Sequence, residues 1–223
     1  MRRSLKSLNA LAVVGAAVVF AACSERSLAP APRGLPAGAP RPDVIINQMA
    51  ADSTSADFTV TPSGGLFVMG PHAVFFPDHA ICDPSTSGYG PDMWDQPCQP
   101  LDTAIQIHAE VRSDSGRAWV EFSPALRFVP TDDPNHYVWM MMRSQAATTA
   151  DPSTYSLFGI LWAPDMTTPG IDEAASDSTM RTYLDTQNGI AFRRIKHFSW
   201  YTVPDGFVGT VDSVVGMVSP VIY

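Results

Sequence analysis

The tripeptide His197-Phe198-Ser199 has the residue types and spacing for one specific reaction. It lies in GIAFRRIKHFSWYTV, residues 189–203, a run rich in aromatic and β-branched residues, which favours a β-strand. Side chains alternate between the two faces of a strand, so His197 and Ser199 are expected on the same face. The imidazole and the hydroxyl then flank the Phe198–Ser199 peptide bond.

This arrangement is suited to an N-to-O acyl shift, in which His197 takes the proton of Ser199 and the serine oxygen attacks the Phe198 carbonyl. The amide becomes an ester, and water then cuts the chain. A planar amide resists attack, so the reaction is expected to need backbone strain from the surrounding sheet. The competing interpretation is that His197 and Ser199 are ordinary strand residues and that Phe198 belongs to the core.

The HFSWY segment resembles the autoproteolysis motif of the ZU-five domain (zona-occludens and uncoordinated-five receptor family). Cleavage in that family falls between Phe and Ser of His-Phe-Ser. The resemblance therefore implies Ser199 as nucleophile, His197 as base and Phe198 as acyl donor. The segments GGLFVMGPHAVFFPDHAI (64–81) and EFSPALRFVP (121–130) resemble the early and middle patterns of the family. No acidic residue that could orient the histidine is identifiable from the sequence.

The rest of the chain predicts an all-β fold to hold this motif. Short apolar runs separated by turn residues, with almost no amphipathic helix, favour an antiparallel β-sandwich, which the ZU-five resemblance also implies. Residues 103–112 predict a strand, and the alternation of apolar and polar residues from Ile105 to Arg112 indicates one buried and one solvated face. Residues 136–143 are apolar on both faces and predict a central strand, with Met140–Met142 as core. The apolar alternation of Ile190 and Phe192 is out of phase with Ile195, which predicts a β-bulge near Arg193 and Arg194.

The first residues predict export and lipid anchoring. Residues 1–22 combine a basic segment with an apolar run too short to span a membrane, as in a signal peptide. The run ends Phe-Ala-Ala-Cys, which resembles a bacterial lipobox and implies lipidation of Cys23; the alternative is a secreted protein cut nearby. Ser24 follows in place of an inner-membrane retention Asp, which favours the outer membrane. Residues 23–56 predict a Pro/Ala-rich tether, and 57–223 the folded domain.

Two further cysteines, Cys82 and Cys98, are expected to form a disulfide, since an exported chain lives where disulfides persist. The bond would close a loop rich in Pro, Gly, Ser and Asp. Tyr89 and Trp94 in this loop are either an exposed recognition surface or fold back over the edge of the core.

Metal sites have weak support in the sequence. His72, Asp78 and His79 match no strong ligand pattern, so we predict no metal or cofactor. Two groups of acids could bind calcium but are expected to be turn formers or a solvated loop. They are Asp83, Asp92 and Asp95, and Asp165, Asp172, Glu173 and Asp177.

The negative net charge of the chain argues against nucleic acids as partners. The net charge of −8 becomes −11 once the three basic residues of the leader are removed, and no basic patch serves a nucleic acid. No pattern for multi-turnover catalysis is present. Two hypotheses follow: a lipid-anchored envelope module that binds an unknown protein or surface partner, or a self-processing protein cut once at Phe198–Ser199.

Overall fold

The computed structural model describes residues 38–40, 54–114, 117–144, 147–148, 158–165 and 167–204. The predicted signal peptide, the predicted lipidation site Cys23, most of the predicted tether and the chain after residue 204 lie outside the described residues. Within the described ranges, no helix has the length and apolar character needed to cross a membrane.

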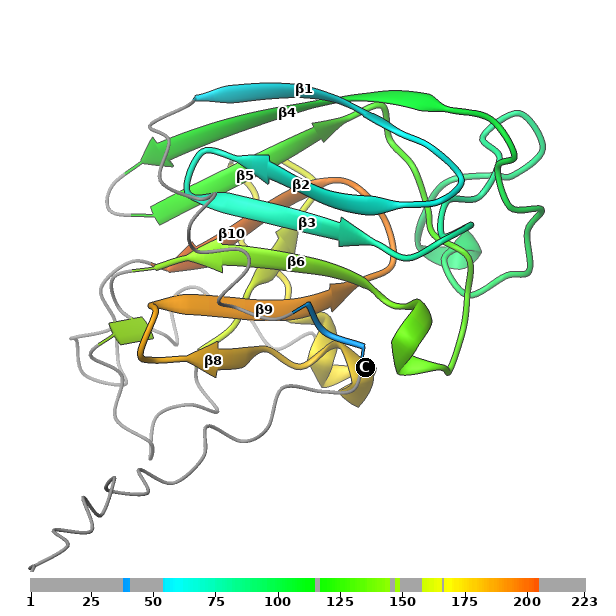
Figure 1. Ribbon diagram of the computed structural model, residues 1–223. Coiled ribbons are helices and arrows are strands. Elements are labelled where there is room, and N and C mark those ends of the chain that lie inside the picture. Colours follow the sequence, from blue (N-terminus) through cyan, green and yellow to red (C-terminus); the bar gives the residue numbers. More distant parts are fainter. Residues whose placement is uncertain are drawn as a thin grey trace, which may run out of the picture. The chain divides into compact units, whose positions relative to one another are not determined.

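The described chain forms two five-stranded antiparallel sheets, which confirms the predicted β-sandwich (Figure 1). In order of pairing, the first sheet contains β1 (Ser55–Val60), β4 (Ile105–Asp114), β5 (Arg117–Ser123), β10 (Trp200–Pro204) and β7 (Leu161–Ala163). The second contains β2 (Gly65–Met69), β3 (His72–Phe76), β6 (Val138–Arg143), β9 (Ile190–Ile195) and β8 (Tyr183–Asp185). Single 3₁₀ turns lie between strands, namely η1 (Pro91–Met93), η2 (Pro134–His136), η4 (Glu173–Ala175) and η5 (Ser178–Met180).

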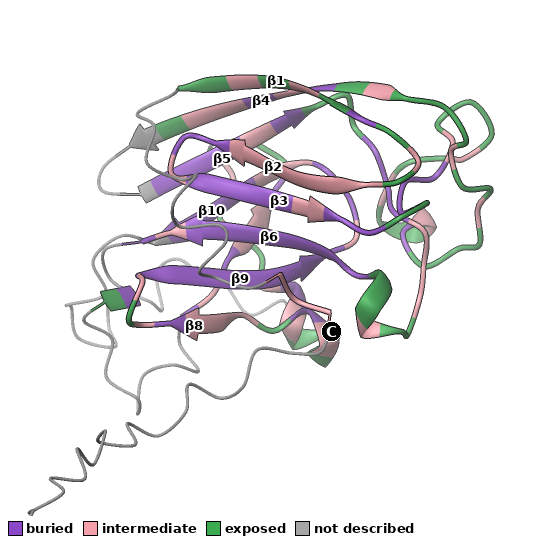
Figure 2. Cartoon of the chain, viewed as in Figure 1, coloured by how far each residue is buried: buried purple, intermediate pink, exposed green. Residues whose placement is uncertain are grey.

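The alternation along β4 produces the predicted half-buried strand. Ile107 and Ala109 are buried against the second sheet, whereas Gln106 and Arg112 are exposed. Solvated polar residues continue onto the edge strand β1, where Asp57 pairs with His108 of β4 at 2.7 Å. Figure 2 shows this edge of the sandwich largely exposed, in contrast to the buried strands β3, β6 and β9.

The central position of β6 is also confirmed. It pairs with β3 on one side and β9 on the other, and Met140, Met141 and Met142 are fully buried. Met140 and Met142 pack in the core between the sheets, while Met141 belongs to a smaller cluster on the opposite face of the second sheet. The three methionines therefore fill core space on both sides of their strand.

The predicted single strand over residues 189–203 is wrong. The segment forms two strands, β9 in the second sheet and β10 in the first, and Lys196–Ser199 crosses between them. The pairing of β9 with β6 runs without interruption from Ile190 to Ile195, so the predicted bulge is absent. His197 and Ser199 consequently lie in a crossing segment and not on one strand face.

The disulfide between Cys82 and Cys98 is confirmed, with Cα atoms 5.7 Å apart. It closes the long connection from β3 to β4. Arg127, which is 3% exposed, ties the loop to the core, because its guanidinium donates to the carbonyls of Gly88 at 2.9 Å and Gln96 at 2.6 Å. The covalent bond and the buried arginine together place this loop against the crossing segment.

Candidate active site

The crossing segment Lys196–Ser199 is held by backbone hydrogen bonds on both sides of the Phe198–Ser199 bond. The Phe198 N–H donates to the Leu126 carbonyl at 2.7 Å, and the Phe122 N–H donates to the Ser199 carbonyl at 3.3 Å. No residue of the segment has a positive φ. The backbone strain that the reaction was expected to need is thus not present as a left-handed conformation. What distinguishes the Phe198–Ser199 bond is its place in the crossing segment between the two sheets.

The Phe198 ring fixes the acyl side of the bond. It is fully buried, stacks on Phe122 with ring centroids 4.0 Å apart, and meets Phe128 and Phe76 edge-on at 5.1 and 5.7 Å. Aromatic rings prefer these offset and edge-to-face contacts. Phe198 is therefore a core side chain, and its packing restricts the movement of its own carbonyl group.

His197 is fully buried and has an acidic partner. Its Nε2 lies 3.3 Å from Oε1 of Glu173, whose other oxygen accepts a hydrogen bond from Arg193 at 2.7 Å. His197 Nδ1 is buried without a hydrogen-bond partner. If Nε2 carries the proton that faces the carboxylate, Nδ1 holds a free lone pair, which is what a general base requires.

Glu173 is the site residue that sequence reasoning missed. It belonged to a loop expected to be solvated, yet it is only 8% exposed. Residues 173–175 form the 3₁₀ turn η4, capped by Asp172, which accepts from the Ala174 N–H at 3.0 Å. This cap orients the turn and directs the next side chain, Glu173, inwards. No local signal separates Glu173 from the neighbouring acids, because its partner His197 is distant in the sequence.

Aromatic side chains enclose the His197 ring. Trp94 stacks on it with centroids 3.6 Å apart and planes 12° apart, and Trp162 meets it edge-on at 5.5 Å. Tyr201 lies 6.0 Å away and donates to the His197 carbonyl at 2.6 Å. The two aromatic residues of the disulfide loop differ: Trp94 is 9% exposed and folds back over the core, whereas Tyr89 is an exposed residue.

Tyr89, from the same loop, reaches the bond itself. Its hydroxyl donates to the carbonyl oxygen of Phe198, although the residue as a whole is 44% exposed. The hydroxyl also interacts with the Ser199 side chain. Burial raises the pKa of Tyr89; the bond with Ser199 opposes this, and the negative charge of Glu173 adds to it. The phenol is therefore a donor at neutral pH.

Ser199 is half-buried, so water has access to this side of the bond. Its hydroxyl donates to the Ala163 carbonyl of β7 at 3.1 Å and not to His197. The structure thus places His197, Phe198 and Ser199 next to one another in the crossing segment, but proton transfer requires the serine hydroxyl to leave Ala163 first. A change of the serine side-chain rotamer is the smallest motion that does this.

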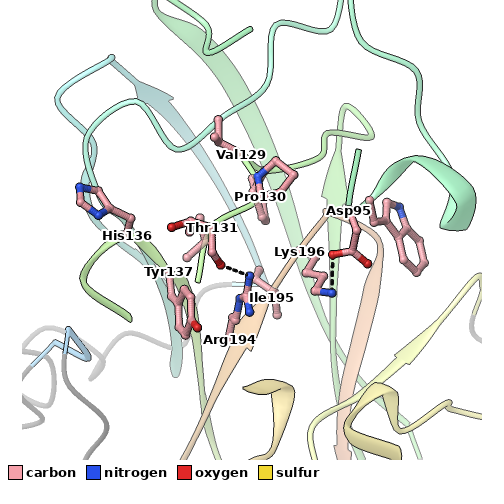
Figure 3. Close-up of a pocket in the computed structure, with 12 residues that line it drawn as sticks. Asp95, Val129, Pro130, Thr131, His136, Tyr137, Arg194, Ile195 and Lys196 are labelled. Carbon is pink, nitrogen blue, oxygen red and sulfur yellow. Dashed lines mark hydrogen bonds and ion pairs between the residues drawn. The ribbon is translucent and has the colours of Figure 1, made fainter. Parts of the chain in front are cut away.

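Lys196 joins the two loops that cover the site. Its ammonium lies 2.6 Å from Asp95 of the disulfide loop and 2.8 Å from Asp177, the residue that caps η5. Figure 3 shows Lys196 pointing to Asp95 at the rim of a shallow pocket, with Arg194 beside it pointing to the Thr131 carbonyl. These ion pairs link the Trp94 side of the site to the Glu173 side.

The other candidate ligands are apart from this site. His72 is buried in β3 and accepts from the Arg143 N–H at 3.2 Å, whereas His79 is exposed. Asp83 and Asp165 accept from backbone N–H groups two residues ahead, as turn formers do. In the part of the chain that the structure describes, no group of three or more His, Cys, Asp or Glu residues could hold a metal ion.

No known protein family, curated protein or solved structure matches the chain. The ZU-five resemblance of HFSWY therefore stays a prediction.

Proposed function

We propose that this chain is a self-processing protein that cuts itself once, between Phe198 and Ser199. The observation that carries the proposal is the buried pair of His197 and Glu173 beside that bond, with one imidazole nitrogen on the carboxylate and the other without a partner. A histidine held in this way is oriented for proton transfer, as in nucleophile–base–acid arrangements generally.

The reaction has two steps. His197 Nδ1 takes the Ser199 hydroxyl proton, the serine oxygen bonds to the Phe198 carbonyl carbon, and the C–N bond breaks as its nitrogen receives the proton from the imidazolium. The Glu173 carboxylate stabilises the imidazolium while it exists. Water then adds to the ester, and the products are a Phe198 carboxylate and a free Ser199 amine.

The position of β10 determines what happens to the products. Cleavage at Phe198–Ser199 separates β10 from β9 covalently, but β10 is paired with β5 on one side and β7 on the other. Thr202 in this strand also donates its hydroxyl to the Ala118 carbonyl at 3.0 Å. The C-terminal piece therefore stays in the first sheet after the cut and leaves only when that sheet is opened.

The proposal includes the cellular setting. The apparent signal peptide and the lipobox-like Cys23 support a protein anchored by lipid in the bacterial envelope, on the outer membrane. The disulfide between Cys82 and Cys98 supports the same setting, because such bonds persist outside the cytoplasm.

The test is the mass of the full chain, purified with detergent from the membranes of an expressing cell and denatured before measurement. Wild type is expected to give two fragments that meet at Phe198–Ser199, and Ser199→Ala one intact chain. Ser63→Ala, an exposed serine in the β1–β2 turn, is the control and is expected to be cut as wild type is. A single uncut wild-type chain rules out self-cleavage.

A second candidate, a binding module for an unknown surface partner, has one observation in its favour. A hollow of about 510 Å³ lies beside β1 and β4, and it is lined in part by Asp57, Gln106 and His108. A photo-cross-linker at Gln106 in intact cells is expected to give one discrete adduct, and a cross-linker at the exposed Asp165 none. Equal labelling at both positions, or at neither, contradicts a binding role for this hollow.

A further inference from the structure

The hydroxyl of Tyr89 occupies the place where the proposed reaction develops negative charge. It donates to the Phe198 carbonyl oxygen, across 109 residues of sequence. That oxygen is the one that becomes an oxyanion when Ser199 attacks the carbonyl carbon. The contact thus joins a side chain of the disulfide loop to the acyl group of the bond that would be cut.

We propose that Tyr89 is a catalytic residue of the self-cleavage, whose hydroxyl stabilises the oxyanion that forms on Phe198. The inference rests on the proposed function and names the group that lowers its barrier. A donor that already points at the oxygen needs no reorganisation as charge develops, and removing one such donor from an enzyme typically slows the reaction by about 10²–10³-fold.

The protonation state of Tyr89 fits this role. A donor must keep its proton at the pH of the reaction, and burial, opposed by the bond with Ser199 and reinforced by the charge of Glu173, raises the pKa of the phenol. Tyr89 is therefore suited to donate to the oxyanion and unsuited to accept the serine proton, which leaves the base role to His197.

Contacts outside the Phe198–Ser199 bond also hold Tyr89 and its loop in place. Arg127 donates to the carbonyl of Gly88, the residue directly before Tyr89, and the disulfide closes the loop. Arg127 also forms an isolated backbone bridge with His197. One buried residue therefore sets the distance between the base and the oxyanion donor, which is the supporting arrangement that a preorganised site needs.

The test compares the rates of self-cleavage of freshly synthesised full-length chains. Tyr89→Phe keeps the ring and removes the hydroxyl, and it is expected to slow cleavage by about 10²–10³-fold. The matched control is Tyr183→Phe, which removes another partly buried tyrosine hydroxyl, one that accepts from Arg181 at 3.0 Å. It is expected to be cut at the wild-type rate.

A second variant separates catalysis from a structural role. Fluorinated tyrosine at position 89 keeps the size and the contact but makes the phenol a stronger donor, so cleavage at neutral pH is expected to accelerate. The cleavage rate falls at alkaline pH, where the phenol loses its proton, and in the fluorinated variant this fall is expected at a lower pH. If Tyr89→Phe fails to fold, the fluorinated variant still tests the role of Tyr89. A cleavage rate that does not change with fluorination overturns the inference.

The outcomes distinguish the two proposals. If wild type is never cut, self-cleavage itself fails. If wild type is cut and Tyr89→Phe is cut at the same rate, self-cleavage stands and the role of Tyr89 is wrong. Equal slowing by Tyr183→Phe likewise overturns a specific role for Tyr89.

Discussion

The Nε2 atom of His197 lies 3.3 Å from Oε1 of Glu173, although the two residues are 24 positions apart in the sequence. Both side chains are buried, and Arg193, also buried, neutralises the carboxylate from its other side at 2.7 Å. A buried charge is tolerated only when it is paired and hydrogen-bonded. The three residues therefore form one unit, and losing any member affects the other two.

Glu173→Gln is expected to lower both stability and the rate of self-cleavage. The amide retains the shape of the side chain but leaves the Arg193 charge unpaired, which costs about 3–5 kcal/mol when a buried pair is broken. Urea unfolding in the Ser199→Ala background measures the stability. The control, Asp133→Ala, removes the cap of a different 3₁₀ turn, η2, for a loss of about 1 kcal/mol. A Glu173→Gln chain as stable as wild type contradicts the pairing.

Replacing Cys82 and Cys98 together by Ser is expected to destabilise the domain and slow cleavage. Opening a loop with a sequence separation of 16 removes a constraint on the unfolded chain, and the chain-entropy relation gives about 3 kcal/mol. Cleavage slows because the loop that carries Tyr89 gains freedom. Urea unfolding and the cleavage time course measure the two effects. Cleavage at the wild-type rate shows that the disulfide is not needed to position the loop.

His72 is expected to make the fold sensitive to mild acid. Burial, aided by the positive charge of Arg143, lowers the pKa of His72 to about 3. The unfolded chain takes up a proton near the ordinary histidine pKa, whereas the folded chain does not. Stability is therefore full above about pH 6.5 and falls as the pH drops towards 3; between about pH 7 and about pH 5 the loss is about 2 kcal/mol.

His72→Asn offers the Arg143 N–H an amide oxygen and cannot be protonated, so it is expected to remove most of this mild-acid loss. Urea unfolding at the two pH values measures it. The control is His79→Asn at an exposed position with φ of 51°, which asparagine tolerates. It is expected to keep the wild-type pH dependence of stability. If His72→Asn loses as much stability in mild acid as wild type does, the loss does not come from His72.

Asp177 is expected to contribute stability that disappears in stronger acid. Burial raises its pKa, but hydrogen bonds from Lys196 and Thr179 and the lysine charge outweigh burial and lower the pKa to about 2. A depressed folded pKa means that the stabilisation is present above the ordinary value of 3.8 and is lost as the pH falls from there to about 2.

Asp177→Asn keeps the cap on the Thr179 N–H and removes the charge, so it isolates the ion pair with Lys196. The variant is expected to show a smaller loss of stability over that acid range, followed by circular dichroism in urea. Asp78→Asn, at an exposed acid outside the site, is the control. Acid curves that coincide for Asp177→Asn and wild type disprove a contribution from this pair.

Features that depend on neighbours along the chain could be predicted from the amino-acid sequence. The period of two in β4 identified its buried face, since side chains of a strand alternate. The apolar run around Met140–Met142 identified the central strand, and two thiols in a chain whose first residues predict export indicated the disulfide. Each of these patterns is local, or rests on counting one residue type.

The assembly of the site could not be predicted in this way, because it depends on contacts between distant elements. Residues 189–203 have the same strand propensity throughout, so nothing local marks Lys196–Ser199 as a crossing; β6 and β5 decide it by pairing with β9 and β10 in different sheets. Glu173 and Tyr89 reach the site across long stretches of chain. Such contacts arise from the packing of whole elements, and a pattern read over a few residues carries no information about them.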